Sequence, residues 1–445
     1  MWNRFLATDN TAMRKTIDVV TMGCSKNLVD SERVIKMLED TGFSVTHDSE
    51  AYKGDIVVIN TCGFIGDAKE ESIEMILKAI SAKENGSIKE IYVMGCLSER
   101  YRSELAAEMP EVDGWYGKFD WIKLAHDLSK RHPGCASWDR VLTTPRYCAY
   151  VKIAEGCNRF CSFCAIPLIT GRYKSRPIDE ILEEVRTLVG RGVKEFNIIA
   201  QDLSSYGVDL YQEQKLAELI DKMSQINGVE WIRLHYAYPA DFPWDVLKVM
   251  NKRLNVCKYL DVALQHISDP VLANMRRHID SVGTRQFLEK VRSEVPGIHI
   301  RTTLMVGFPG ENDTEFNELK EFVREQRFER MGAFAYCEED DTFGEKNFAD
   351  DISQNVKNKR LDEIMAIQEE IAMKHNKSKI GCRLRVIIDT VNEDHYIGRT
   401  EFDSPEVDPE VIVAKTIDLK PGDFVYVDII DAMPFELIGT PVMCS

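Results

Sequence analysis

Short apolar segments alternate with amphipathic segments over the first third of the chain. β-Branched and apolar residues fill positions 17–22, 55–60 and 90–94, which predicts three strands. Positions 31–38 and 70–80 repeat apolar residues at helical spacing and predict helices between them. Strands that alternate with helices are typical of a parallel sheet covered by helices. We therefore expect an N-terminal parallel α/β domain over residues 15–132.

The same alternation continues between residues 147 and 376. It predicts six strands, at 150–154, 196–200, 231–235, 259–264, 300–306 and 332–336. Between the first two, the apolar residues of 178–189 fall on one face at helical spacing, and a last helix is expected over 356–375. Six such units favour a central (βα)6 partial barrel, with its ligand site at the carboxyl ends of the strands. Proline and glycine at 131–134 and 143–145 predict a linker before it.

The period changes again after residue 379. Short strands are predicted at 384–389, 412–414, 424–429 and 436–438, with turn residues between them. This pattern is typical of a small OB-like β-barrel, and we expect one over 379–445. That segment holds 6 Lys and Arg against 13 Asp and Glu, a net charge of −7. A barrel that binds RNA normally has the opposite sign.

Composition limits the classes of protein to which the chain can belong. Its 445 residues exceed what one hydrophobic core usually serves, and 44% hydrophobic with 29% charged residues is typical of a globular protein. No apolar run approaches the roughly 18 residues that span a bilayer, and residues 1–10 do not resemble a secretory signal. We expect a cytoplasmic protein with no membrane partner. The net charge of −17 disfavours a large nucleic-acid footprint and suits a basic protein partner.

Three of the twelve cysteines form a cluster in sequence. Cys157, Cys161 and Cys164 lie within eight residues, directly after the first predicted barrel strand. Clustered cysteines in the cytosol more often bind metal than form disulfides. Three thiolates can hold three irons of a 4Fe–4S cluster and leave the fourth iron open for S-adenosylmethionine. The alternatives are three incidental thiols and a zinc site that lacks its fourth ligand, but structural zinc sites favour paired two-residue spacings and four ligands.

Three further cysteines each follow the end of a predicted strand of the N-terminal sheet. Cys24, Cys62 and Cys96 are far apart in sequence, but the carboxyl ends of parallel strands meet at one edge. We expect them to form a second site, although a single free cysteine is often only a small buried hydrophobe. The other cysteines share no pattern, and we expect no joint site from them: Cys135, Cys148, Cys257, Cys337, Cys382 and Cys444.

The spacing of Cys157, Cys161 and Cys164, together with Phe163, resembles the radical SAM superfamily. The order of a three-cysteine α/β domain, this barrel and a small β-barrel is similar to the methylthiotransferase family, with the last barrel resembling a TRAM domain. The resemblance implies two 4Fe–4S clusters and S-adenosylmethionine as cofactors. It also implies that sulfur held at the Cys24 cluster is methylated, and that a 5′-deoxyadenosyl radical then opens an unactivated C–H bond for the methylthio group.

Two branches of that family compete as the closer match. One modifies an adenosine of tRNA (the MiaB type), and the other modifies the β-carbon of an aspartate in small-subunit ribosomal protein twelve (the RimO type). The runs Asn60-Thr-Cys-Gly-Phe-Ile, Ala200-Gln-Asp-Leu and Leu264-Gln-His-Ile-Ser-Asp resemble the protein-modifying branch, as does Asp403-Ser-Pro-Glu-Val-Asp. The acidic last barrel supports this choice, because ribosomal proteins are generally basic. One departure is Glu339-Asp-Asp-Thr, where the family commonly has Glu-Gly-Thr.

The resemblance also implies a set of partners and cofactor contacts. The partners are ribosomal protein twelve, free or on the ribosome, and a reducing electron donor; no tRNA is expected. Phe163, by its place before the last cysteine, would lie near the adenine, although it could equally pack the loop. Gln201 (beside Asp202) and Gly307 lie at strand ends and are our other candidates for contacts with S-adenosylmethionine. His235 and His266 lie at strand ends too, and we interpret them as structural.

Two other classes of protein remain as alternatives. An electron-transfer iron–sulfur protein would need neither an open iron nor a cofactor-sized barrel, and it would form no 5′-deoxyadenosine. A nucleic-acid-binding module is the other class, prompted by the last barrel. Weak and salt-insensitive RNA affinity would count against it.

Overall fold

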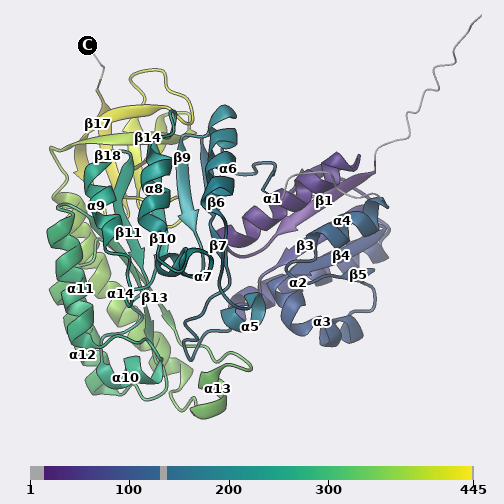
Figure 1. Ribbon diagram of the computed structural model, residues 1–445, viewed down its shortest axis with the longest axis horizontal. Coiled ribbons are helices and arrows are strands. Elements are labelled where there is room, and N and C mark those ends of the chain that lie inside the picture. Colours follow the sequence, from purple (N-terminus) through teal and green to yellow (C-terminus); the bar gives the residue numbers. More distant parts are fainter. Residues whose placement is uncertain (1–14, 131–137, 443–445) are drawn as a thin grey trace, which may run out of the picture. The chain divides into compact units, whose positions relative to one another are not determined.

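The computed structural model describes residues 15–130 and 138–442, and the chain divides near residue 143 into two compact units (Figure 1). Most of the predicted linker, 131–134, lies outside the described residues, while 143–145 is neither helix nor strand. No helix in the described part of the chain is long and apolar enough to cross a membrane.

The first unit is a parallel sheet with helices packed against it, as the alternating pattern predicts. Its strand order is β2-β1-β3-β4-β5, and all its strand pairs are parallel. This order reverses direction between β1 and β3, which is where open α/β sheets bind ligands. Its elements are β1 (Thr16–Thr21), α1 (Ser25–Asp40), β2 (Ser44–His47), β3 (Ile56–Thr61), α2 (Gly66–Glu84), β4 (Glu90–Gly95), α3 (Cys96–Glu108), β5 (Gly114–Trp115) and α4 (Trp121–Ser129).

Several elements of this unit differ from the predicted ones. The edge strands β2 and β5 were not predicted, because β2 is only partly buried and β5 has two residues. Helix α1 begins six residues earlier than predicted. Its first turns hold polar residues that are nevertheless buried, among them Lys26, Asn27 and Asp30. An apolar periodicity cannot detect a helix whose buried face is polar.

The second unit is built on a six-stranded sheet, which confirms the predicted strand count and class. The order is β13-β12-β11-β10-β9-β6, so each strand pairs in parallel with its neighbour in sequence. The strands are β6 (Cys148–Lys152), β9 (Glu195–Ile199), β10 (Trp231–Ala237), β11 (Val256–Val262), β12 (His299–Val306) and β13 (Arg330–Ala335). They lie within three residues of the predicted positions, since buried parallel strands are continuous apolar runs.

Helices cover the outside of this sheet, and short elements occupy its connections (Figure 1). The longer helices are α6 (Ile178–Gly190), α8 (Leu216–Ser224), α9 (Asp245–Lys252), α11 (Ser281–Glu294), α12 (Asp313–Gln326) and α14 (Gln354–Lys377). The short elements are β7 (Ala154–Glu155), α5 (Ile166–Thr170), β8 (Lys174–Ser175), η1 (Leu203–Ser205), α7 (Val208–Tyr211), α10 (Asp269–Asn274) and α13 (Phe343–Asn347).

A closed five-stranded barrel follows, in the order β14-β15-β16-β18-β17. Its strands are β14 (Arg383–Val391), β15 (His395–Thr400), β16 (Glu410–Ala414), β17 (Phe424–Ala432) and β18 (Glu436–Pro441). The predicted barrel is confirmed, but β15 is an additional strand. It was missed because its residues, HYIGRT, include few apolar positions.

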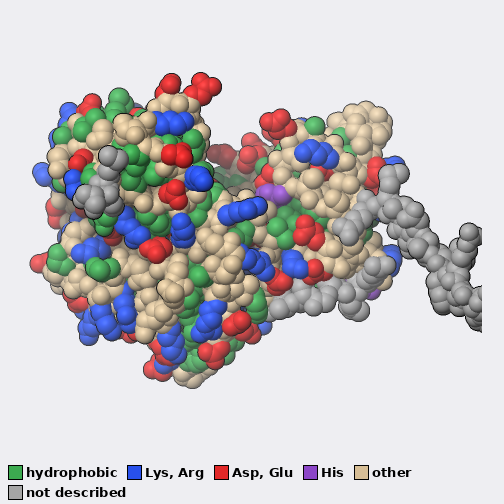
Figure 2. All heavy atoms as spheres, turned by 90° about the horizontal axis from the view of Figure 1, so that it is seen from above, with side chains coloured by type: hydrophobic (Ala, Val, Ile, Leu, Met, Phe, Trp, Pro, Cys, Tyr) green, Lys and Arg blue, Asp and Glu red, His purple; other side chains and the backbone are tan. Residues whose placement is uncertain are grey.

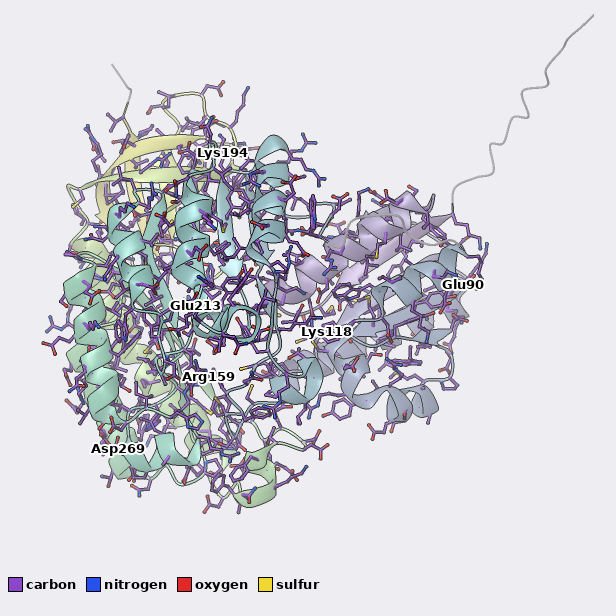
Figure 3. All side chains as sticks on the ribbon, in the orientation of Figure 1. Glu90, Lys118, Arg159, Lys194, Glu213 and Asp269 are labelled. Carbon is purple, nitrogen blue, oxygen red and sulfur yellow. The ribbon has the colours of Figure 1, made fainter. Side chains whose placement is uncertain are left out.

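The small barrel packs against the amino ends of the sheet strands. Trp231, at the start of β10, meets Phe424 of β17 edge to face with ring centroids 4.8 Å apart. Lys194, just before β9, donates to the carbonyl of Gly422 at 2.6 Å. Figure 3 shows Lys194 near the small barrel and Arg159 at the other end of the strands. The carboxyl ends of the strands are therefore left for the loops that bear the cysteines.

Candidate functional site

The loop after β6 contains Cys157, Cys161 and Cys164, and hydrogen bonds to two other segments hold it in place. The Cys157 N–H donates to the carbonyl of Gly171 at 3.2 Å. Ser162 donates through its N–H to the carbonyl of Met275 at 3.1 Å and through its hydroxyl to that of Asn274 at 2.6 Å. Cys157 and Cys161 are buried and Cys164 is partly exposed. The three thiols are close enough to influence one another electrostatically.

Burial dominates the acid–base behaviour of these thiols. Desolvation raises the pKa of Cys157 to about 12, because the N–H of Arg159, which donates to its sulfur at 3.5 Å, compensates only in part. Desolvation and the neighbouring Cys161 raise the pKa of Cys164 well above its ordinary value. Such thiols are protonated at neutral pH unless a cation replaces the proton. Their chemistry therefore fits a metal-binding loop.

Arg159, within the same loop, is held by two carboxylates. Its Nε donates to Asp202 Oδ2 at 2.7 Å, and its Nη1 donates to Asp241 Oδ2 at 2.9 Å. Asp202 follows β9 and also accepts from the hydroxyl of Ser205 at 2.6 Å. The guanidinium lies over the ring of Tyr238, 4.2 Å from its centroid. The strand-end run containing Asp202 thus orients the cysteine loop.

The three predicted cofactor contacts have different surroundings. Phe163 is buried in an apolar cluster and meets Phe308 edge to face, with centroids 6.4 Å apart. Gln201 donates to Glu155 Oε2 at 3.3 Å, and its buried Oε1 has no hydrogen-bond partner among the described residues. Gly307 has φ +73°, and its N–H already donates to Glu311 Oε2 at 3.0 Å. Of the three, Gln201 has a buried polar atom left for a ligand.

The two strand-end histidines have partners inside the sheet unit. His235 Nε2 lies 3.2 Å from Asn197 Oδ1, and its other ring nitrogen lies 3.8 Å from Asp261. Desolvation lowers the pKa of His235. His266 is fully buried, with Nε2 3.2 Å from Glu311 Oε2. The contacts of His235 agree with a structural interpretation, whereas His266 Nε2 has no hydrogen-bond partner among the described residues.

Cys24, Cys62 and Cys96 lie at the carboxyl edge of the other sheet. Cys24 caps the start of α1 after β1, Cys62 follows β3, and Cys96 is the first residue of α3 after β4. Cys62 and Cys96 are buried, whereas Cys24 is exposed. Gly23, with φ +89°, brings the chain so close to Cys62 that an added Cβ would lie 2.8 Å from its sulfur. The sheet thus brings together three cysteines, the first and last of which are 72 positions apart in sequence.

A buried polar group supports this second triad. Asn27 accepts from the Cys96 thiol at 3.6 Å and donates to the carbonyls of Met22 and Thr61 at 3.0 Å. Lys118 is 1% exposed and pairs with Asp30 at 2.8 Å. Figure 3 shows Lys118 at the opposite end of the sheet from Glu90, which begins β4.

Charge and burial act oppositely on the thiols of this triad. Desolvation raises the pKa of Cys96 to about 12, although the Lys118 ammonium opposes it, and desolvation also raises the pKa of Cys62. Cys24 differs, because desolvation is outweighed by the charges of Lys26 and Lys118 and by backbone N–H donors, so its pKa is lowered. An accessible, low-pKa thiol is the kind that reaches a metal or a sulfur species first.

Cysteine thiols are the donors that each triad offers to a metal centre. Within residues 15–130 and 138–442, no three Cys, His, Asp or Glu side chains are arranged to hold one metal ion. A 4Fe–4S cluster instead takes each thiolate on a different iron, and cysteine is its normal ligand. Both donor sets fit such a cluster.

The four other cysteines that the structure describes lie in β6 and β11, after β13 and before β14. Cys148 and Cys257 are buried, and Cys337 and Cys382 are exposed. Cys135 and Cys444 lie outside the described residues.

Comparison with protein families divides the chain in the same order as the elements. Residues 16–117 match an uncharacterized protein family, UPF0004; residues 151–323 match the radical SAM superfamily; and residues 380–442 match the TRAM domain. Curated relatives match over nearly the whole chain. A protein of Bacteroides fragilis named "Ribosomal protein uS12 methylthiotransferase RimO" is 59% identical over 427 residues, which are 96% of this chain and 99% of the relative.

The chain belongs to the RimO family. Proteins of the same name from Phocaeicola vulgatus and Flavobacterium johnsoniae are 59% and 47% identical, each over 96% of this chain and 98–99% of their own length. Membership of the RimO family confirms the predicted resemblance. The tRNA-modifying alternative is not favoured.

Solved structures extend the likeness of this RimO-family chain at the level of the fold. The radical S-adenosylmethionine methyltransferase TsrM from Kitasatospora setae, solved with cobalamin and a [4Fe-4S] cluster, aligns with a TM-score of 0.56 over 73% of this chain and 75% of its own. OxsB, a cobalamin-dependent S-adenosylmethionine radical enzyme, aligns with a TM-score of 0.53 over 80% of this chain and 56% of its own. At 15% and 13% identity, the likeness concerns the fold alone.

The site contains functional candidates that the sequence did not indicate. Arg159, Tyr238 and Arg277 surround the first triad, and Asn27 and Lys118 support the second. The only available signal was Arg159, which lies between two of the cysteines in sequence. The others are remote in sequence and reach the cysteines only through the fold.

Proposed function

We propose that this RimO-family chain is a radical enzyme that adds a methylthio group to the β-carbon of an aspartate in ribosomal protein uS12. The observation that carries the proposal is the coexistence of two three-cysteine sites in one chain. Its relatives, named as uS12 methylthiotransferases, match it over 96% of its length. An electron-transfer iron–sulfur protein would need neither an open iron nor a cofactor-sized barrel.

Cys157, Cys161 and Cys164 would hold the first 4Fe–4S cluster and leave one iron open to S-adenosylmethionine. That pair of cofactors supplies the radical chemistry needed at a carbon whose C–H bond has no useful acidity. The chain would hold the cluster in a fixed position and exclude water from it. The ties from Ser162 to the loop that ends α10 fix the three sulfurs, and apolar side chains around Phe163 exclude water.

Gln201 is our proposed polar contact to the cofactor. Its buried Oε1 can accept a hydrogen bond, for which the cofactor offers hydroxyl and ammonium donors. For Phe163 we keep both interpretations, adenine contact and loop packing. Gly307 would act by letting the chain pass Lys357, whose Cγ lies 2.4 Å from where a Cβ would stand.

Cys24, Cys62 and Cys96 would hold a second 4Fe–4S cluster, again with one open position, where sulfur is carried before transfer. The exposure and lowered pKa of Cys24 suit a site that must exchange ligands with solvent. The buried ammonium of Lys118 places positive charge beside the triad, which favours anionic sulfur there.

The acidic residues of the terminal barrel also support a basic protein substrate, but they do so less strongly than the net charge of the barrel suggests. Asp403 and Asp408 are buried against Arg330 and Arg301, at 2.6 and 2.5 Å. These two of the 13 acidic residues thus serve the junction with the sheet. Figure 2 shows acidic and basic side chains interspersed on the visible face of the protein. A basic ribosomal protein would meet only the exposed carboxylates.

The wider assignment follows from this activity. The proposed domains are residues 15–132, 147–376 and 379–445, for the second cluster, the radical chemistry and the TRAM-like barrel. A reducing electron donor is required, and uS12, free or within the ribosome, is the partner. Ribosomal substrates imply a cytoplasmic location.

The test is mass spectrometry of uS12, free and within small subunits, and of bulk tRNA. Each is incubated anaerobically with reconstituted protein, S-adenosylmethionine and reductant. We expect a methylthio mass gain on one aspartate of uS12. Cys161→Ala should abolish both this gain and 5′-deoxyadenosine. Cys62→Ala should abolish the gain but retain 5′-deoxyadenosine.

The matched control is Cys382→Ala, which removes an exposed cysteine outside both triads and should change neither product. A mass gain on tRNA alone would overturn the substrate. Retention of 5′-deoxyadenosine by Cys161→Ala would overturn the site.

A further inference from the structure

Tyr238 is held between two guanidinium groups next to the first cysteine triad. The Cζ atoms of Arg159 and Arg277 lie 4.2 and 4.1 Å from its ring centroid. The ring is 5% exposed, and its hydroxyl donates to the carbonyl of Arg277 at 2.5 Å. Cations over an aromatic face are attracted to it, most strongly when they are desolvated.

The two arginines differ in how their charge is balanced. Arg159 is paired with Asp202 and Asp241. Arg277 is 3% exposed, and in the described part of the chain no carboxylate forms an ion pair with it. Its Nη1 donates to Cys161 Sγ at 3.3 Å, its Nη2 donates to the carbonyl of Ala263, and its Nε has no partner among the described residues.

A buried arginine without a counter-charge is costly, because the charge has lost its water. The nearest group that can become an anion is the Cys161 sulfur. With three thiolates, a 4Fe–4S core of charge 2+ is a monoanion, and the one-electron reduced core of charge 1+ is a dianion. The attraction between Arg277 and the cluster is therefore greater in the reduced state.

The position of Arg277 is set by the same contacts that fix the cysteine loop. Arg276 and His278 on either side of it have φ +58° and +54°, a backbone strain that persists only when surrounding contacts impose it. Ser162 donates to the carbonyls of Asn274 and Met275, which directly precede this segment. The guanidinium is thus held next to the Cys161 sulfur.

We propose that Arg277 sets the reduction potential of the cluster held by Cys157, Cys161 and Cys164, raising it so that the cluster can accept an electron. The proposal rests on the proposed function, since it requires the cluster at this triad. Hydrogen bonds to the sulfurs and local charge are the protein's means of tuning such a cluster. Arg277 is a positioning residue in this sense and need not touch the substrate.

The experiment is a redox titration of the full chain followed by electron paramagnetic resonance. The second triad is replaced by alanine in every sample so that one cluster contributes. Dithionite supplies one electron, and the core goes from charge 2+ to 1+. Arg277→Gln, which removes the charge, should lower the equilibrium constant for reduction about tenfold, a fall in potential of about 59 mV. The control is Arg276→Gln, an exposed neighbour stacked on Phe343, which should leave the potential unchanged.

An Arg277→Gln potential equal to that of the control, at equal iron content, overturns the proposal. If Arg277→Gln does not retain the cluster, Arg277→Lys decides, because lysine keeps the charge but loses the planar donor to Cys161. Because the charge stays and only the hydrogen bond to Cys161 Sγ changes, we then expect a fall of about threefold or less in the equilibrium constant, and a tenfold fall or a rise overturns the proposal. Failure of the proposed function is distinct: the parent chain itself would then carry no cluster or form no 5′-deoxyadenosine.

Discussion

Glu195 at the start of β9 is the buried anion on which the junction of sheet and small barrel depends. It is fully buried, accepts from Arg399 of β15 at 2.8 and 3.0 Å, and accepts from Arg233 of β10 at 3.1 Å. Burial alone would raise the pKa of Glu195, but the two guanidinium groups lower it from 4.5 to about 2. A difference of about 2.5 pKa units corresponds to about 3 kcal/mol of stability.

The perturbation is Glu195→Gln, which keeps the side-chain volume and removes the charge. At pH 7 we expect the free energy of unfolding to fall by about 3 kcal/mol, since two buried arginines lose a counter-charge. Arg399 retains Asp389 at 2.8 Å, so the loss should not be larger. For a unit of this size, that is a fall in melting temperature of roughly 6 °C.

The pH dependence follows from the direction of the shift. Because the folded pKa of Glu195 is depressed, its contribution is complete above about 4.5 and is lost as the pH falls through about 2. The parent and variant should therefore differ fully at pH 7 and converge between these two values. Metal-free protein is used so that acid-labile cofactors do not contribute.

The assay is thermal unfolding followed by calorimetry, with Glu183→Gln as the control. Glu183 pairs with Arg186 at 3.4 Å on the exposed face of α6, and its removal should change the stability by less than about 0.5 kcal/mol. Equal melting temperatures for Glu195→Gln and the parent at pH 7 would refute the reasoning. So would a difference that does not shrink on acidification.

Two further predictions concern the second triad. Gly23→Ala places a Cβ within 2.7 Å of Cys62 Cβ at φ +89°, so we expect the variant to lose about half of the iron that the parent binds. The control is Gly86→Ala, which is also at positive φ but has open space around it and should keep all of the iron. Equal iron contents in the two variants would contradict the prediction. Lys118→Met removes the buried ammonium that pairs with Asp30 at 2.8 Å and should cost about 3–5 kcal/mol in denaturant unfolding. An unchanged midpoint would show that this pair contributes nothing.

The strands and the cysteine sites could be predicted largely from sequence, because both depend on local chemistry. A buried parallel strand must be a continuous apolar run, so six strands from β6 to β13 were found close to their true positions. The missed strands β2, β5 and β15 are short or rich in polar residues. Their place in a sheet comes from their neighbours and not from their own pattern.

The charges at the sites could not be predicted in this way. In sequence, Arg277 resembles its neighbour Arg276, yet one is buried against Cys161 and the other is exposed. Lys118 comes close to the second triad only because β4, β5 and the segment after them pack at one sheet edge. No periodicity distinguishes a lysine that is buried beside a thiol from one that faces water.

The sequence by itself determined the kind of chemistry available: thiols at two sets of strand ends, and a family resemblance that the relatives confirm. Only the tertiary structure decided which charges act on those thiols. It also showed that Asp403 and Asp408 neutralise arginines inside the protein. The physical reason is that side-chain type sets which bonds an atom can form, whereas electrostatic energy depends on distance and desolvation. Both are set by residues that lie far apart in the chain, such as Arg330 and Asp403 at 73 positions and Arg277 and Cys161 at 116.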